Sequence, residues 1–108
     1  MKTGDIILIP FPFSDLKNVK VRPALVITIT KDGYDDIVIS AISSVIPGVL
    51  GENEMIIKSS PVNNLRTDSV LKVDRIVTLK NETVITNLGR LNHREFQLFR
   101  RKFFALID

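Results

Sequence analysis

The chain of 108 residues has no cysteine and no tryptophan, and its single histidine is His93. Without cysteine, neither disulfide bonds nor thiolate metal sites can form, which is consistent with a reducing compartment. Structural zinc sites need several Cys or His ligands, so one histidine excludes them and argues against catalytic zinc as well. The acidic residues lack the spacing of a metal cluster, and we expect neither a metal nor a cofactor.

Long hydrophobic runs are also missing, as are the G-x-S-x-G motif and Gly-rich phosphate loops. The sequence does not open with the basic and then apolar pattern of a signal peptide, so we expect a soluble cytoplasmic protein. The 15 Lys and Arg residues exceed the 12 Asp and Glu residues, which gives a net charge of +3. This mild excess permits a nucleic-acid partner and equally an acidic protein partner.

Apolar segments bounded by turn residues predict a mainly β chain, residues 1–108 forming a single domain with one C-terminal helix. The expected strands are 6–9, 23–30, 36–43, 55–58, 68–79 and 83–86. The longest of them is long enough to bend across two sides of a barrel. The segment 10–20 is predicted to be a surface loop, which either carries function or only connects two strands.

The C-terminal helix is predicted from its first turn, because Asn92 followed by Glu95 matches the reciprocal capping pattern. Apolar side chains then recur at helical spacing and are expected to face the core. They are Phe96, Phe99, Phe103 and Ile107, with Phe104 and Leu106 broadening the same face.

Arg22 stands directly before Pro23, at the entry to the apolar run 24–29. Proline cannot donate to a sheet ladder, so Pro23 is expected to be the first residue of a strand, with Arg22 at the rim of the sheet. A guanidinium there either binds a phosphate or carboxylate or forms an ordinary surface salt bridge. Ser43 and Ser44 end the next strand, where serines also commonly satisfy backbone groups.

Arg75 shares the parity of the apolar residues in the long strand 68–79. This position is unusual for an arginine unless it is paired, lies at a bulge or faces a subunit interface.

The available side chains limit the chemistry that the protein can perform. Arginine and hydroxyl groups without a metal suit internal phosphoryl transfer in RNA, in which the substrate's own 2′-hydroxyl attacks the adjacent phosphate. The residues thus permit a ribonuclease without establishing one.

Five short motifs follow one another along nearly the whole chain. They are Gly4-Asp5-Ile6-Ile7, Phe11-Pro12-Phe13-Ser14-Asp15, Arg22-Pro23-Ala24-Leu25-Val26, Ala41-Ile42-Ser43-Ser44 and the strand 68–79. In this order and at this spacing they resemble the MazF/PemK family of toxin endoribonucleases. The resemblance implies a small SH3-like β-barrel of the type shared by CcdB, Kid and MazF, assembled as a homodimer. It also implies sequence-specific, metal-independent cleavage of single-stranded mRNA to a 2′,3′-cyclic phosphate and a 5′-hydroxyl, causing growth arrest, with a cognate antitoxin protein as partner in a type II toxin-antitoxin system.

The same resemblance assigns roles to individual residues. It implies that Arg22 binds the scissile phosphate and takes part in proton transfer, and that Ser43 supplies a hydroxyl to the same group. Because arginine stays protonated near neutral pH, stabilising charge suits it better than acting as a general base. The remaining positions implied to contact RNA are Phe13, Ser14, Asp15, Lys17, Lys20, Ser44 and Arg75.

Two positions depart from the family pattern. Ala41 stands where many relatives have proline, and Ser43 stands where threonine is commonest. Serine keeps the hydroxyl but gives up the restricted χ1 of threonine. The alternative function is a non-catalytic RNA- or protein-binding toxin module of the same fold, such as a gyrase inhibitor, although that family acts through a C-terminal tryptophan.

Overall fold

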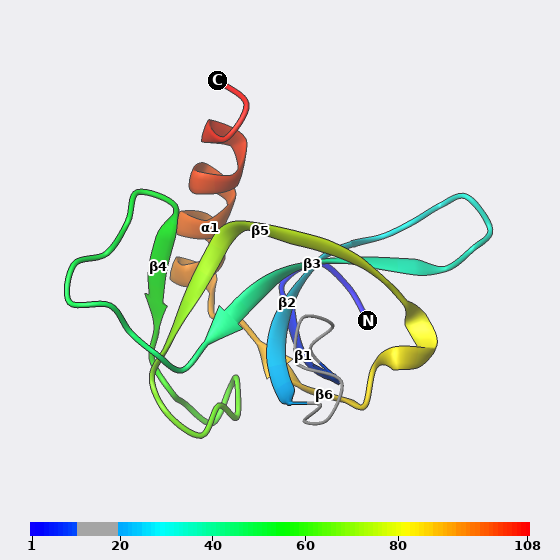
Figure 1. The fold of residues 1–108 in the computed structure, drawn as a ribbon, viewed down its shortest axis with the longest axis horizontal. Coiled ribbons are helices and arrows are strands. Elements are labelled where there is room, and N and C mark those ends of the chain that lie inside the picture. Colours follow the sequence, from blue (N-terminus) through cyan, green and yellow to red (C-terminus); the bar gives the residue numbers. More distant parts are fainter. Residues whose placement is uncertain (11–19) are drawn as a thin grey trace.

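One curled antiparallel sheet of six strands, followed by a helix, forms the part of the protein that the computed structural model describes, residues 1–10 and 20–108 (Figure 1). The elements are β1 (Asp5–Pro10), β2 (Val21–Ile29), β3 (Asp36–Ser43), β4 (Glu54–Ile57), β5 (Ser69–Lys80), the 3₁₀ turn η1 (Asn81–Thr83), β6 (Thr86–Arg90) and α1 (His93–Ala105). Their order across the sheet is β4-β5-β3-β2-β1-β6. The predicted mainly β architecture with a C-terminal helix is confirmed.

The sheet is buried on both faces, because successive residues of its central strands enter different cores. In β1, Ile6 packs into a cluster with Leu25 and Phe99, which we call the helix-side core. The next residue, Ile7, belongs to a second cluster with Val26, which we call the outer core. The buried members of the outer core are Ile7, Ile9, Ala24, Val26, Ile37 and Ile39. Burial on both sides explains why β1 and β2 are continuous apolar runs without clear alternation.

A bulge divides β5 into two halves. The consecutive β3 residues Ser40 and Ala41 pair with Ile76 and Lys72, so residues 73–75 of β5 have no counterpart on β3. An odd number of extra residues exchanges the two faces of the strand from one half to the other.

This exchange corrects one prediction from the sequence. Leu71 lies in the helix-side core, whereas Leu79 packs against the outer core, so the apolar residues of 68–79 do not share one face. Arg75 is exposed and belongs to the bulge. Its parity with the apolar residues therefore does not force it into a core.

The bulge is held by a buried hydroxyl. Ser40 is 0% exposed, and its Oγ donates a hydrogen bond to the Val73 carbonyl at 2.9 Å. In Ser40→Ala this carbonyl loses the bond in a dry environment, and we expect the free energy of unfolding to fall by about 1–3 kcal/mol in urea denaturation. Ser44→Ala is the matched control, because Ser44 is exposed, and its change should stay within about 0.5 kcal/mol. Equal losses in the two variants would contradict this role of Ser40.

The position of Pro23 differs from the prediction. Pro23 is the third residue of β2 and pairs with Leu8 of β1, so it does not begin the strand. It is tolerated because it lies beyond Ala24, the last β2 residue paired with β3, where β2 has become an edge on that side.

The last strand also lies later in the chain than expected. Residues 81–83 form η1, and β6 begins at Thr86, where the sequence pattern placed the end of a strand. The side chain of Thr83 stabilises the turn by donating to the Lys80 carbonyl at 2.6 Å. β6 then pairs with β1 from Leu8 to Asp5.

The capping box of α1 is confirmed. The Glu95 N–H donates to Asn92 Oδ1 at 2.8 Å, and the Asn92 N–H donates to Glu95 Oε1 at 3.0 Å. Phe99 is buried in the helix-side core, with Phe96, Leu98, Phe103 and Leu106 packed against it. Phe104 and Ile107 are 55% and 87% exposed, so their assignment to the core face was wrong, and Ile107 follows the end of α1. In the described part of the chain no helix is long and apolar enough to cross a membrane.

Candidate active site

Arg22 and Ser43 stand at neighbouring strand ends. Ala24 of β2 pairs with Ala41 of β3, and each candidate residue lies two positions beyond this pair on its own strand. Side chains two positions apart share a face, so Arg22 and Ser43 both stand on the face of the outer core. On the other side of β2, Arg22 pairs with Ile9, which belongs to that core. A rigid, buried sheet thus presents a guanidinium and a hydroxyl at one rim.

The hydroxyl of Ser43 is already oriented by the backbone. Its Oγ accepts a hydrogen bond from the Val45 N–H at 3.1 Å, which is the structural role that serines take at strand ends. A hydroxyl has two lone pairs and one proton, so Ser43 keeps the capacity to donate to a ligand oxygen. Arg22 and Ser43 are both half-buried. The arrangement offers two donors for a phosphate whose negative charge increases during a reaction.

The other predicted contact residues do not all gather here. Lys20 is exposed and directly precedes β2. Ser44 is exposed and lines a separate hollow, not the face on which Ser43 stands. Arg75 lines a separate polar hollow with Glu52, Asn53 and Asp74. Phe13, Ser14, Asp15 and Lys17 lie outside the described residues.

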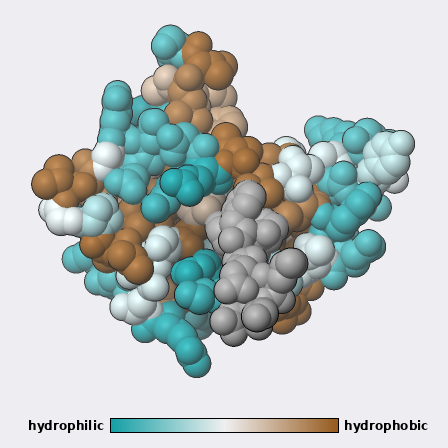
Figure 2. Space-filling model, in the orientation of Figure 1, coloured by the Kyte–Doolittle hydropathy of each residue, from teal (hydrophilic) through white to brown (hydrophobic). Residues whose placement is uncertain are grey.

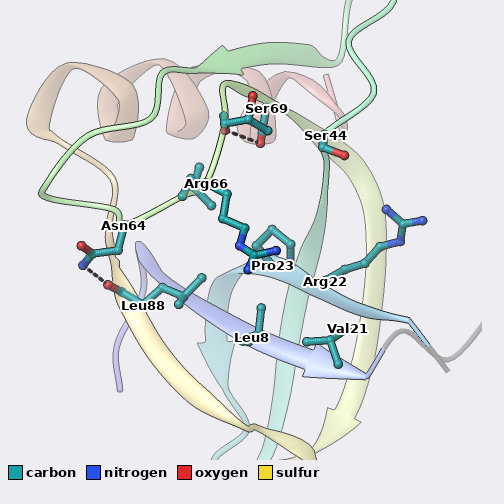
Figure 3. A pocket seen from close by; sticks show the side chains of 11 residues that line it. Leu8, Val21, Arg22, Pro23, Ser44, Asn64, Arg66, Ser69 and Leu88 are labelled. Carbon is teal, nitrogen blue, oxygen red and sulfur yellow. Dashed lines mark hydrogen bonds between the residues drawn. The ribbon is translucent and has the colours of Figure 1, made fainter.

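A hollow of about 610 Å³ opens on the helix side of β2, and we call it the Arg66 hollow. Its wall is mostly apolar, and Arg66 extends into it (Figure 3). The guanidinium of Arg22 points away from it, although the residue itself borders the hollow. The lining residues are Leu8, Val21, Arg22, Pro23, Ser44, Asn64, Leu65, Arg66, Thr67, Ser69 and Leu88.

The connection between β4 and β5 carries Arg66 and is well anchored. Asn63 is 1% exposed, and its Oδ1 accepts from the N–H groups of Ser60 and Leu65, both at 3.0 Å. Its Nδ2 donates to the Lys58 carbonyl at 2.8 Å. Arg66 is not singled out by any motif of the sequence. The only available signal was one cation beside a leucine in an otherwise polar connection.

One carboxylate of the β2–β3 hairpin has a shifted pKa. The pKa of Asp32 is lowered, because its carboxylate accepts hydrogen bonds from the Tyr34 N–H and the Thr30 hydroxyl. Asp32 belongs to the β2–β3 hairpin, at the opposite end of β2 from Arg22. Among residues 1–10 and 20–108 no group of three or more His, Cys, Asp or Glu could hold a metal ion.

Comparison with known protein families identifies the chain's relatives. Residues 2–106 match the family described as PemK-like, MazF-like toxin of type II toxin-antitoxin system. The chain belongs to this family, and the resemblance that the five motifs indicated is therefore confirmed. No curated protein sequence gave a significant match.

Solved structures of MazF proteins share the fold. Toxin MazF-mt6 of Mycobacterium tuberculosis superimposes with a TM-score of 0.74 at 18% identity, covering 96% of both chains. MazF from Deinococcus radiodurans has a TM-score of 0.72 at 17% identity, over 99% of this chain and 96% of that one. An endoribonuclease from a mycobacterial species, in complex with its cognate antitoxin, has a TM-score of 0.71 at 12% identity, over 99% and 94%. These likenesses establish the MazF-type fold.

Proposed function

We propose that this member of the PemK/MazF toxin family is a sequence-specific, metal-independent endoribonuclease for single-stranded mRNA. The observation that carries the proposal is the placement of Arg22 and Ser43 on one face, at adjacent strand ends, in a chain of this family. The structural neighbour solved with its antitoxin is itself named an endoribonuclease, which supports the same activity here. The residues present suit a reaction that needs charge stabilisation but no resident metal.

The reaction needs no water and no group from the protein in the bonds that change. The substrate's 2′-hydroxyl attacks the adjacent phosphorus, and the bond from phosphorus to the 5′-oxygen breaks. The 2′-hydroxyl loses one proton and the leaving 5′-oxygen gains one, so the products are a 2′,3′-cyclic phosphate and a 5′-hydroxyl. Arg22 donates to the phosphate oxygens that gain negative charge, and Ser43 donates to the same group.

The activity can be tested directly with purified protein. Long single-stranded RNA is incubated with it in EDTA, and the new ends are sequenced and their phosphates identified. We expect discrete cuts with a cyclic phosphate on the upstream fragment. Intact RNA would reject the ribonuclease and leave the non-catalytic binding module, and activity that EDTA abolishes would reject the metal-independent mechanism.

Ser43 offers a second test, because its hydroxyl can be removed or retained. We expect Ser43→Ala to slow single-turnover cleavage by roughly a hundredfold, the usual cost of one lost donor to the transition state. Ser43→Thr keeps the hydroxyl and should stay within a few-fold of the wild type. Melting temperatures separate this effect from loss of the bond to the Val45 N–H. If Ser43→Ala cleaves at the wild-type rate, the hydroxyl has no part in the reaction.

We further propose that the protein is a cytoplasmic homodimer bound by a cognate antitoxin. Exposed apolar side chains in the β3–β4 connection support a protein interface, and Figure 2 shows this connection as hydrophobic surface. They are Val45, Ile46, Val49 and Leu50. Sedimentation equilibrium of the purified chain gives its mass in solution, and a monomer at all concentrations would refute the dimer.

A further inference from the structure

The Arg66 hollow and the Arg22 side chain lie on opposite faces of the same strand end. Val21 and Pro23 line the hollow, while Arg22 between them directs its guanidinium away from it (Figure 3). This end of β2 lies beyond its last pair with β3. Only the end of β2 therefore separates the Arg66 hollow from the Arg22 guanidinium, and adjoining nucleotides of one RNA chain can occupy both.

The walls of the hollow fit a flat group with an apolar face and a polar edge. Leu8, Pro23 and Leu88 supply apolar surface, and Ser44 and Thr67 are also among the lining residues. Arg66 forms no hydrogen bond or ion pair with the residues that the structure describes, although its side chain extends over the apolar wall. A guanidinium so placed has all its donors available for a ligand.

Asn64 lies at the outer edge of the hollow (Figure 3). Its Nδ2 donates to the Leu88 carbonyl at 2.5 Å, and its amide is turned away from Arg66. Apolar surface and a guanidinium fork together match a nucleobase better than a bare carboxylate, which can pair with the fork but leaves the apolar wall uncovered. Proteins read single-stranded RNA in this way, by stacking on side chains and by hydrogen bonds to exposed base edges.

We propose that the Arg66 hollow binds one base of the RNA beside the cut, with guanine preferred, so that Arg66 is a specificity-determining residue. The proposal rests on the RNA cleavage proposed above. Arginine pairs with guanine in bidentate fashion through O6 and N7, both of which are acceptors. Adenine presents an amino donor in place of O6, and it would face the guanidinium with only one acceptor.

Binding without cleavage tests this site first. Fluorescent 2′-O-methyl RNA heptamers cannot be cut, because the attacking hydroxyl is blocked, and each carries guanine or adenine at one position. By fluorescence anisotropy we expect the wild-type protein to prefer guanine at one position by about tenfold, and Arg66→Ala to abolish that preference. Arg66→Lys retains the charge without the fork, so it should keep much of the affinity but lose the preference. Arg101→Ala, an exposed arginine of α1, is the matched control and should keep it.

Cleavage and peptide binding complete the test. In the RNA cutting assay, the cut sites of the wild-type protein should share a guanine at one flanking position. The cut sites of Arg66→Ala should no longer share it. If wild-type protein cuts selectively and Arg66→Ala keeps the same preference, the inference fails while the ribonuclease stands. If wild-type protein neither cuts RNA nor prefers any base in the heptamers, both proposals fail. An eight-residue peptide of alternating Glu and Leu is the last probe, and loss of its binding in Arg66→Ala with unchanged base preference would make the hollow a protein site instead.

Discussion

Replacing Arg22 with alanine is expected to lower the single-turnover rate of RNA cleavage by at least about a hundredfold. The guanidinium is the donor best placed for the phosphate, because it stands at a strand end held by pairing with Ile9 of β1. Its charge opposes the negative charge that builds up on the phosphorus oxygens. Rates are measured with enzyme in excess, so that product release does not limit them.

The controls for Arg22→Ala separate catalysis from folding and from general charge. Arg22→Lys keeps the charge but loses the planar fork, and its rate should fall between those of the wild type and the alanine variant. Arg101→Ala removes one positive charge from α1 and should leave the rate unchanged. All variants are compared by thermal melting. Cleavage by a folded Arg22→Ala protein at the wild-type rate would remove Arg22 from the active site.

Replacing Gly89 with alanine is expected to lower the free energy of unfolding by about 3 kcal/mol. A Cβ at this position would lie 2.1 Å from the Val62 carbonyl oxygen and 2.9 Å from Asn63 Cα. Both are backbone atoms of the β4–β5 connection, so no side chain can rotate away to make room. The strand β6 and this connection would have to separate, which also breaks the bond from the Arg90 N–H to the Val62 carbonyl.

A second glycine provides the matched control. A Cβ on Gly48 meets nothing within 4 Å, and Gly48→Ala should change stability by less than about 1 kcal/mol. Urea denaturation of both variants gives the comparison. A Gly89→Ala protein as stable as Gly48→Ala would mean that the connection carrying Arg66 can move away from β6. In that case the Arg66 hollow would also lack a fixed shape.

Local features of the structure were largely predictable from the sequence. The Asn92 and Glu95 pair predicted the start of α1, because capping needs only residues three positions apart. Residues 36–43 were predicted as a strand with the observed bounds, since an Asp-Gly turn precedes a β-branched run. The displacement of β6 was not predictable, because the competing η1 turn and the β-branched residues 83–86 give similar local signals.

The candidate site was predictable only in part. Arg22 and Ser43 could be proposed from the sequence because they lie in recognisable motifs, and their common face follows from the pairing of Ala24 with Ala41. Arg66 could not be recognised from the sequence, because its proposed role depends on the apolar wall beside it. Leu8, Pro23 and Leu88 of that wall come from three different strands. Residues that act through such neighbours carry no signal of their own in a single chain.

By itself, the sequence determined the β-rich architecture, the capped helix and the membership in a toxin family, because each depends on local patterns or on ordered motifs. Only the tertiary structure decided which face each residue occupies. The three-residue bulge opposite Ser40 exchanged the faces of β5 and placed Arg75 outside the core. The buried hydroxyl of Ser40 holds this bulge through its hydrogen bond to the Val73 carbonyl. Likewise, the contact of Gly89 with Val62 and the hollow around Arg66 exist only where separate segments meet. The physical reason is that strand register and close backbone approach arise from pairing between distant residues, which local propensity does not encode.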